Sequence, residues 1–216
     1  SHHDLHVHPG HNIAPGTNKA LLTLSSGKTI VLQKKLVPNQ INDAGISIKV
    51  AGAQLDYNNN NKLQMLNDTY NTLTTPRGGQ FQLILSDGTK VWLNAESSIT
   101  YPVKFTGGKR EVTTTGEVYF EVMEDTKHPF LVKTGNQITE DIGTAFDIKY
   151  YKESTGIKTT LFQGAIKVNN HLLKPGQQAT VTGQNIRVSS ANLEKVAAWR
   201  NGLFYFNNEA FNDVML

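Results

Sequence analysis

Residues 81–93, FQLILSDGTKVWL, decide the fold class of this chain. Apolar side chains recur at every second position on both sides of Ser86-Asp87-Gly88, which is the pattern of half-buried strands. Glycine supplies the positive φ of a tight turn, and the pair Asp-Gly favours a type I′ turn. The stretch therefore predicts an antiparallel hairpin closed by a type I′ turn.

The same hairpin occurs a second time, 61 residues upstream. Residues 22–32 (LTLSSGKTIVL) are identical to residues 83–93 at five of eleven positions. A single repeat at so long a spacing is not typical of a solenoid array. We therefore infer one hairpin that is duplicated inside a single domain, near residues 14–32 and 75–93.

Further strands follow glycines along the chain. Alternating apolar residues come after Gly116, Gly143 and Gly164, and each run predicts a strand. This organisation predicts an all-β fold, an antiparallel meander that closes as a β-sandwich or a short β-roll. Residues 34–75 are less patterned, and the asparagine run 58–61 indicates the tip of a loop.

The two ends of the chain depart from the strand pattern. Residues 1–11 contain five histidines without apolar periodicity, and we expect a flexible lead-in before a β domain over residues 12–192. Residues 193–216 carry the helical signals: Leu193, Val196, Ala197 and Arg200 have helical spacing, and an asparagine after residue 206 suits the cap of a second helix. We expect short helical segments there, as a linker and the truncated start of a further domain.

Charge and composition exclude several partners. The formal charge of +3 is scattered, and no run of like charge exceeds Lys34-Lys35, so nucleic-acid binding is not expected. The chain has no cysteine, which rules out disulfides and thiolate metal sites. It also contains no apolar run of the roughly 20 residues that span a bilayer.

The sequence contains no common enzyme signature. Glu117 and Glu121 share a strand face, but four residues of strand separate their Cα atoms by about 13 Å, more than the carboxylate pair of a glycosidase allows. His128 and His171 fit ordinary turn or surface positions, and the histidines of the lead-in fit a tail better than a metal site. We therefore expect no enzyme, no cofactor and no metal site.

Aromatic side chains offer two interpretations. Trp92 and Tyr119 point away from their apolar strand neighbours, which fits either a sheet packed on both faces or an exposed platform for a sugar or a partner. We favour packing; the alternative is a carbohydrate-binding or adhesin-like module that also uses Tyr101. The densest aromatic cluster follows residue 203, and it supplies our candidate partner-binding residues, Phe204, Phe206 and Phe211.

A series of short motifs in fixed order resembles the FecR-like anti-sigma regulators. The motifs are TPRGGQF at 75–81, LSDGTKVWLNAESS at 85–98, GEVYFEV at 116–122, PFLV at 129–132, GTAFDI at 143–148 and LKPGQQA at 173–179. The resemblance covers nearly the whole chain from His11 onward. It singles out motif positions that we expect to be structural, namely Pro76, Arg77, Gly78, Asp87, Gly88, Trp92, Asn94, Gly116, Phe120, Gly143, Phe146, Gly164, Pro175 and Gly176.

The resemblance implies where the protein is located in the cell and what it does. Such regulators are single-pass inner-membrane proteins of Gram-negative bacteria that relay a signal by protein contact. Their periplasmic part senses the signalling domain of a TonB-dependent outer-membrane transporter, and their cytoplasmic part holds an extracytoplasmic-function sigma factor. This chain corresponds to the periplasmic part, so we expect the membrane helix and the sigma-binding region to precede it. We expect contact with the transporter mainly through the C-terminal domain that begins near its end.

Overall fold

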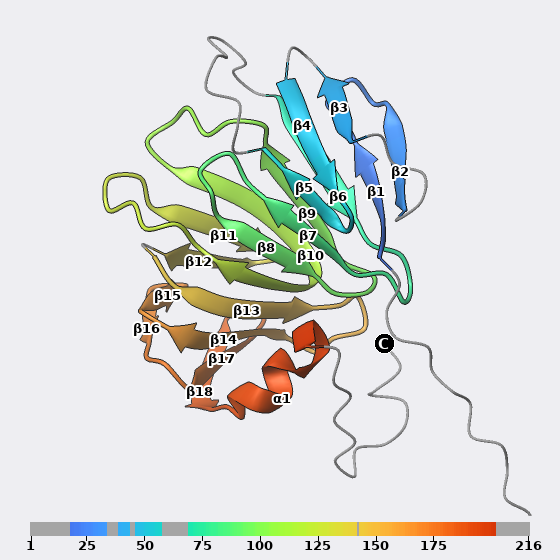
Figure 1. The fold of residues 1–216 in the computed structure, drawn as a ribbon. Helices are drawn as coiled ribbons and strands as arrows, with labels where there is room; N and C mark the ends of the chain where they lie inside the picture. Colours follow the sequence, from blue (N-terminus) through green and yellow to red (C-terminus); the bar gives the residue numbers. More distant parts are fainter. Residues whose placement is uncertain (1–17, 34–38, 44–45, 58–68, 142, 202–216) are drawn as a thin grey trace, which may run out of the picture.

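A computed structural model describes residues 18–33, 39–43, 46–57, 69–141 and 143–201. These residues form eighteen strands followed by one short α-helix and one turn of 3₁₀-helix (Figure 1). The strands are β1 (Lys19–Thr23), β2 (Thr29–Gln33), β3 (Gln40–Asp43), β4 (Ile46–Ala51), β5 (Gln54–Asp56), β6 (Tyr70–Thr74), β7 (Phe81–Ile84), β8 (Lys90–Leu93), β9 (Ser98–Pro102), β10 (Arg110–Glu121), β11 (Phe130–Thr134), β12 (Gln137–Asp141), β13 (Ala145–Tyr150), β14 (Ile157–Gln163), β15 (Ile166–Val168), β16 (His171–Leu173), β17 (Gln177–Thr182) and β18 (Asn185–Ser190). The helical elements are α1 (Leu193–Ala197) and η1 (Ala198–Asn201). The all-β prediction is confirmed.

The strands form one curled sheet with two rows that share β10. The first row runs β2, β1, β6, β9, β10, β11, β12, β15, β16. The second row runs β3, β4, β5, β7, β8, β10, β13, β14, β17, β18. All pairings within these rows are antiparallel except β5 with β7 and β10 with β11, so the meander has become a mixed sheet.

The core lies between the inner faces of the two rows. Leu22, Leu73 and Ile99 from the first row belong to the same buried cluster as Leu83 and Phe120 from the second. Along β7, β8 and β9 the buried residues alternate with half-buried or exposed ones, as the period-2 pattern predicts. The packing therefore resembles the sandwich among the closures predicted from the sequence.

The duplicated hairpin is present, and its two copies have the same register. Leu22 lies opposite Ile30 in the first copy, and Leu83 lies opposite Val91 in the second, again 61 residues apart. In the second turn the amide of Gly88 donates to Leu85 O at 2.9 Å, and Gly88 has φ +89°. Neither Ser86 nor Asp87 has a positive φ, so the turn is a type I turn with a glycine bulge and not the type I′ turn predicted.

Gly116 marks the point where β10 passes from one row to the other. Residues 113–115 pair with β9, residues 116–121 pair with β13, and residues 118–121 also pair with β8. Gly116 has φ +78°, and a Cβ there would lie 2.6 Å from Ser97 Cα. Only glycine fits at position 116, because the positive φ is unfavourable for other residues and there is no space for a Cβ.

Residues 34–75 contain more regular structure than their pattern suggests. Strands β3, β4, β5 and β6 lie there, because cross-strand partners stabilise segments with weak local signals. The helical spacing from Leu193 is confirmed by α1 and η1. The histidine-rich lead-in, the asparagine run and the second predicted helix lie outside the described residues. Within the described ranges, no helix is long and apolar enough to cross a membrane.

Candidate functional site

A row of side chains crosses the outer face of the second row of strands. Gln54, Gln82, Trp92, Tyr119 and Asp147 are direct cross-strand neighbours on β5, β7, β8, β10 and β13. Each alternates with core residues along its strand, so all five point away from the core. We call the part of this face around Trp92, Tyr119 and Asp147 the outer site.

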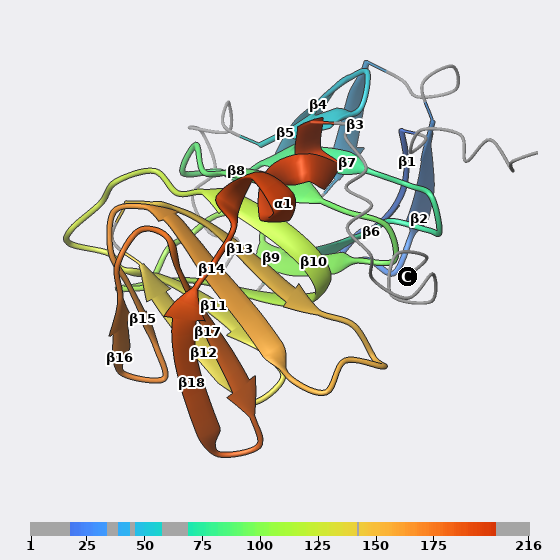
Figure 2. The same cartoon turned by 90° about the horizontal axis from the view of Figure 1, so that it is seen from below.

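The C-terminal arm, residues 193–201, lies over the outer site. Figure 2 shows α1 and the turn after it lying across one face of the sheet, over β8, β13 and β14. The helix begins at the N-cap Asn192, whose side chain accepts a hydrogen bond from the Lys195 amide at 2.9 Å. No residue of α1 is buried, whereas Ala198 in η1 is buried. The arm is therefore held by its last residues.

Arg200 is the principal contact of the arm. Its guanidinium carbon lies 4.0 Å from the centroid of the Tyr119 ring and 5.4 Å from the centroid of the Trp92 ring. Its Nη1 is 3.1 Å from Glu121 Oε1, and the rings of Trp92 and Tyr119 meet edge to face at 5.7 Å. A planar cation is thus held by two aromatic rings and one carboxylate.

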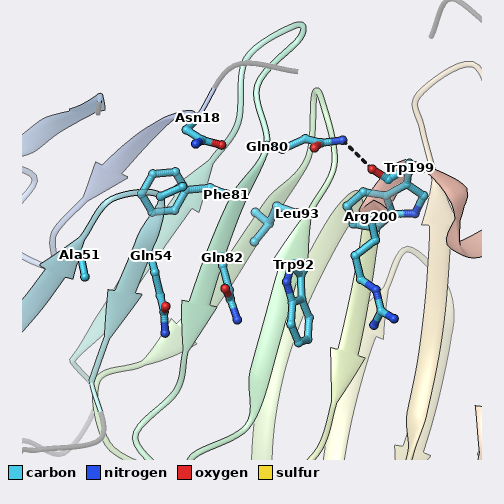
Figure 3. A pocket seen from close by; sticks show the side chains of 11 residues that line it. Asn18, Ala51, Gln54, Gln80, Phe81, Gln82, Trp92, Leu93, Trp199 and Arg200 are labelled. Carbon is cyan, nitrogen blue, oxygen red and sulfur yellow. Dashed lines mark hydrogen bonds between the residues drawn. The ribbon is translucent and has the colours of Figure 1, made fainter. Parts of the chain in front are cut away.

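A chain of hydrogen bonds connects the backbone of the arm to a buried carboxylate. Gln80 Nε2 donates to Trp199 O at 3.3 Å (Figure 3) and to Asn94 Oδ1 at 3.0 Å. Asn94 Nδ2 donates in turn to Glu117 Oε2 at 2.7 Å. Lys149 Nζ lies 3.7 Å from the other oxygen of Glu117. The arm, β7, β8 and β10 are therefore linked through polar side chains.

Asp147 is the electrostatically unusual group of the outer site. The residue is 2% exposed, and burial raises its pKa well above the ordinary value, with a further increase from the charge of Glu117. Lys149, the indole of Trp199 and Arg200 oppose this rise in the pKa. Asp147 Oδ1 and Trp199 Nε1 are nevertheless buried without a hydrogen bond of good geometry. Burial also raises the pKa of Tyr119, which Arg200 partly offsets.

A groove extends from the outer site toward β5. It has a volume of about 270 Å³, and its lining includes Gln54, Gln82 and Trp92 from the sheet and Trp199 and Arg200 from the arm. In Figure 3 the side chains of Gln54, Gln82 and Trp92 project from neighbouring strands toward the same side. Amides and aromatic rings suit noncovalent binding of a polypeptide or another uncharged polar group.

The arrangement supports binding more than chemistry. Within the described ranges, no three His, Asp or Glu side chains are placed to hold a metal ion. His128 and His171 are both exposed, His128 in the loop before β11 and His171 at the start of β16, and His128 Nδ1 contacts Asp125 Oδ2 at 2.7 Å. Hydrogen bonding to His128 lowers the pKa of Asp125, which is the behaviour of a surface pair.

Two motif positions reach the outer site, and they are Trp92 and Asn94. Other motif positions support the sheet itself. Asp87 Oδ2 accepts from Arg110 Nη1 at 2.7 Å beneath the second hairpin turn, and Phe120 stacks on Phe146 in the core with 5.0 Å between centroids.

The remaining motif positions lie in turns and close approaches. Arg77 Nε pairs with Glu96 Oε1 at 2.8 Å, in the turn before β7 that also contains Pro76 and Gly78. Gly143 leaves no room for a Cβ beside Glu124, and Gly164 none beside Thr144; Pro175 and Gly176 form the turn before β17.

The proposed aromatic platform does not exist as one surface. Tyr101 is fully buried on the inner face, where its hydroxyl donates to Tyr57 Oη at 2.9 Å. Tyr119 is on the outer face but only 4% exposed, and Arg200 covers Trp92. The interpretation of Trp92, Tyr119 and Tyr101 as a joint stacking surface is therefore wrong, because residue 101 lies on the core side of β9. The candidate contacts Phe204, Phe206 and Phe211 lie outside the described residues.

Sequence reasoning missed the arm residues Trp199 and Arg200 and their partner Asp147. One signal was available, since Asp147 stands between the apolar residues Phe146 and Ile148 and is therefore on the outer face if these are in the core. No sequence signal connects that face to the arm.

Comparison with known proteins identifies a family and similar solved structures. The FecR protein family matches residues 71–167, which contain the sheet part of the outer site but not the arm. Two crystal structures of a protein from Parabacteroides distasonis ATCC 8503, described as a "putative anti-sigma factor", are similar to this chain. One is 31% identical with a TM-score of 0.62, over 67% of this chain and 71% of that chain. The other is 32% identical with a TM-score of 0.61, over 66% and 70%. No curated protein matches.

Proposed function

This chain belongs to the family of FecR-like anti-sigma factors, and we propose that it relays a signal from a TonB-dependent outer-membrane transporter to a sigma factor. Its role is that of an anti-sigma regulator, which works by protein contact and needs no catalytic group. The proposal places the chain in the periplasm, as part of a single-pass inner-membrane protein. The transporter's signalling domain contacts the polypeptide at and after the arm, and the sigma factor binds the cytoplasmic region.

The docked arm is the observation that carries the proposal. It is the last described element, and the polypeptide continues beyond it. Arg200 joins the arm to Tyr119 and Glu121, both on β10. A partner that pulls or rotates the following residues therefore acts on β10 directly, because Arg200 loses its contacts when the arm moves.

A continuous path of paired strands leads from the arm toward the start of the chain. Strand β10 pairs with β9 through Thr113, β9 pairs with β6 through Thr100, and β6 pairs with β1 through Thr72. Strand β1 begins at Lys19, the side on which the family's membrane helix lies. In this proposal the arm is either docked or released, and the sheet transmits this difference to its membrane-proximal end. The change there alters how tightly the regulator binds the sigma factor.

The experiment is affinity capture with the full-length regulator. Detergent-solubilised outer membranes and periplasmic extract are passed over the immobilised protein, and bound proteins are identified by mass spectrometry. The proposal predicts recovery of a TonB-dependent transporter. A variant truncated after residue 192 is expected to lose most of it. Recovery of glycans or background proteins alone would contradict the proposal and favour the carbohydrate-binding alternative.

A further inference from the structure

Arg200 supplies the closer of the two positive charges beside Glu121. Its Nη1 lies 3.1 Å from Glu121 Oε1, whereas Lys90 Nζ lies 4.0 Å from Glu121 Oε2. Glu117 has its own partner, Lys149, at 3.7 Å. Asp147 is not counted as a charge, because burial raises its pKa well above the ordinary value. Without the arm, Glu121 keeps only the longer contact with Lys90, and the rings of Trp92 and Tyr119 lose their cation, so the surface is complementary to a cation.

The geometry favours arginine over lysine. The guanidinium lies close to the Tyr119 ring, and Phe162 holds that ring from another side by an edge-to-face contact at 5.2 Å. Glu121 fixes one end of the planar group at 3.1 Å. A planar, delocalised cation uses the ring and the carboxylate together, which the compact ammonium of lysine does less well.

The arm itself is weakly held. Helix α1 has five residues and none is buried, and a helix of this length is not stable alone. Beneath the arm, the contact between the Trp199 indole and the Asp147 carboxyl falls short of a hydrogen bond of good geometry. A segment that gives Asp147 a better hydrogen bond would bind more tightly than the arm does at this point. The docked arm is therefore replaceable.

We propose that the arm is the internal occupant of a surface that binds an arginine-bearing segment of a protein partner. The partner's arginine takes the place of Arg200 against Tyr119 and Glu121, and the arm is released. The inference rests on the proposed function for the existence of a signalling partner. It adds the chemistry of the segment that this partner presents, and it makes the arm an autoinhibitory contact.

The test uses the arm's own sequence, LEKVAAWRN (residues 193–201), as a fluorescently labelled peptide. Its binding is measured by fluorescence anisotropy to the wild-type chain and to the double variant Trp199→Ala/Arg200→Ala. The emptied variant is expected to bind about tenfold tighter than the wild type. Adding Glu121→Gln is expected to reverse most of that gain. A peptide with lysine in place of arginine is expected to bind several-fold more weakly.

Three outcomes would overturn the inference: equal binding to wild type and variant, equal binding of the arginine and lysine peptides, or no effect of Glu121→Gln. The single variant Arg200→Ala repeats the test if the double variant does not fold, as judged by circular dichroism. The peptide assay needs no transporter. A negative peptide result therefore does not contradict the proposed relay, which the capture experiment tests separately. A negative capture result likewise does not change what the peptide assay says about the arginine-binding surface.

Discussion

Replacing Gly116 by alanine should be among the most damaging single changes in this protein. A Cβ at this position would lie 2.6 Å from Ser97 Cα and 2.7 Å from Glu96 O, and neither backbone atom is able to rotate away. The residue also has φ +78°, which costs an alanine about 1–2 kcal/mol. Overpacking adds about 1–3 kcal/mol. We expect Gly116→Ala to lower the free energy of unfolding by about 2–5 kcal/mol, a large fraction of the stability of an ordinary domain.

Gly176→Ala is the matched control. Gly176 has a similar φ of +82°, but no heavy atom lies within 4 Å of the position of its Cβ. It therefore incurs the backbone cost alone, about 1–2 kcal/mol. Urea unfolding followed by tryptophan fluorescence measures both variants with one probe. If the two variants lose the same stability within about 0.5 kcal/mol, the close approach of β10 to Ser97 is not what fixes the passage between the two rows.

Three further changes test the frame and the outer site, each by urea unfolding. Arg110→Met should cost about 3–5 kcal/mol because it leaves Asp87 without its buried partner, whereas Lys133→Met in an exposed ion pair should cost less than about 1 kcal/mol. Burial raises the pKa of Asp147, so the native state binds that proton more tightly than the unfolded state, and stability falls as pH rises from about 4 through the raised pKa. Asp147→Asn should remove this fall, and an unchanged pH profile would refute it. Tyr101→Phe should cost about 1 kcal/mol through the lost hydrogen bond between two buried hydroxyls, and a neutral effect would contradict that bond.

Local signals were enough to predict the two hairpins. In residues 22–32 and 83–93 the alternation, the turn residues and the pairing all lie within eleven positions, so the two residues of each cross-strand pair are close in the sequence. The turn type was wrong because Asp-Gly also fits a type I turn whose glycine forms the bulge, and only the backbone of Asp87 distinguishes the two.

Non-local pairing could not be predicted. Strand β6 stands between β5 and β7 in the chain, and residues 122–129 separate β10 from β11, so no local pattern indicates that these pairs are parallel. Strands β3 to β5 have weak patterns of their own and depend on partners found elsewhere in the sheet.

Only the sheet residues of the outer site could be predicted from the sequence. Alternation places Trp92 and Tyr119 on the face opposite the core, and this is where they lie. The covering arm was not predictable, because 79 residues separate Glu121 from Arg200 and 119 separate Gln80 from Trp199. A single cation in a short helical segment has no sequence pattern that identifies two distant rings as its partners.

The most direct test of the relay is sigma-factor-dependent transcription in cells whose full-length regulator carries Arg200→Ala. The account predicts that the ratio of induced to uninduced transcription falls toward one, because the arm no longer couples the partner to β10. The control Lys167→Ala, at an exposed position of β15 outside the proposed path, should keep the wild-type ratio. A wild-type ratio in the Arg200→Ala cells, at equal protein level, would contradict the account.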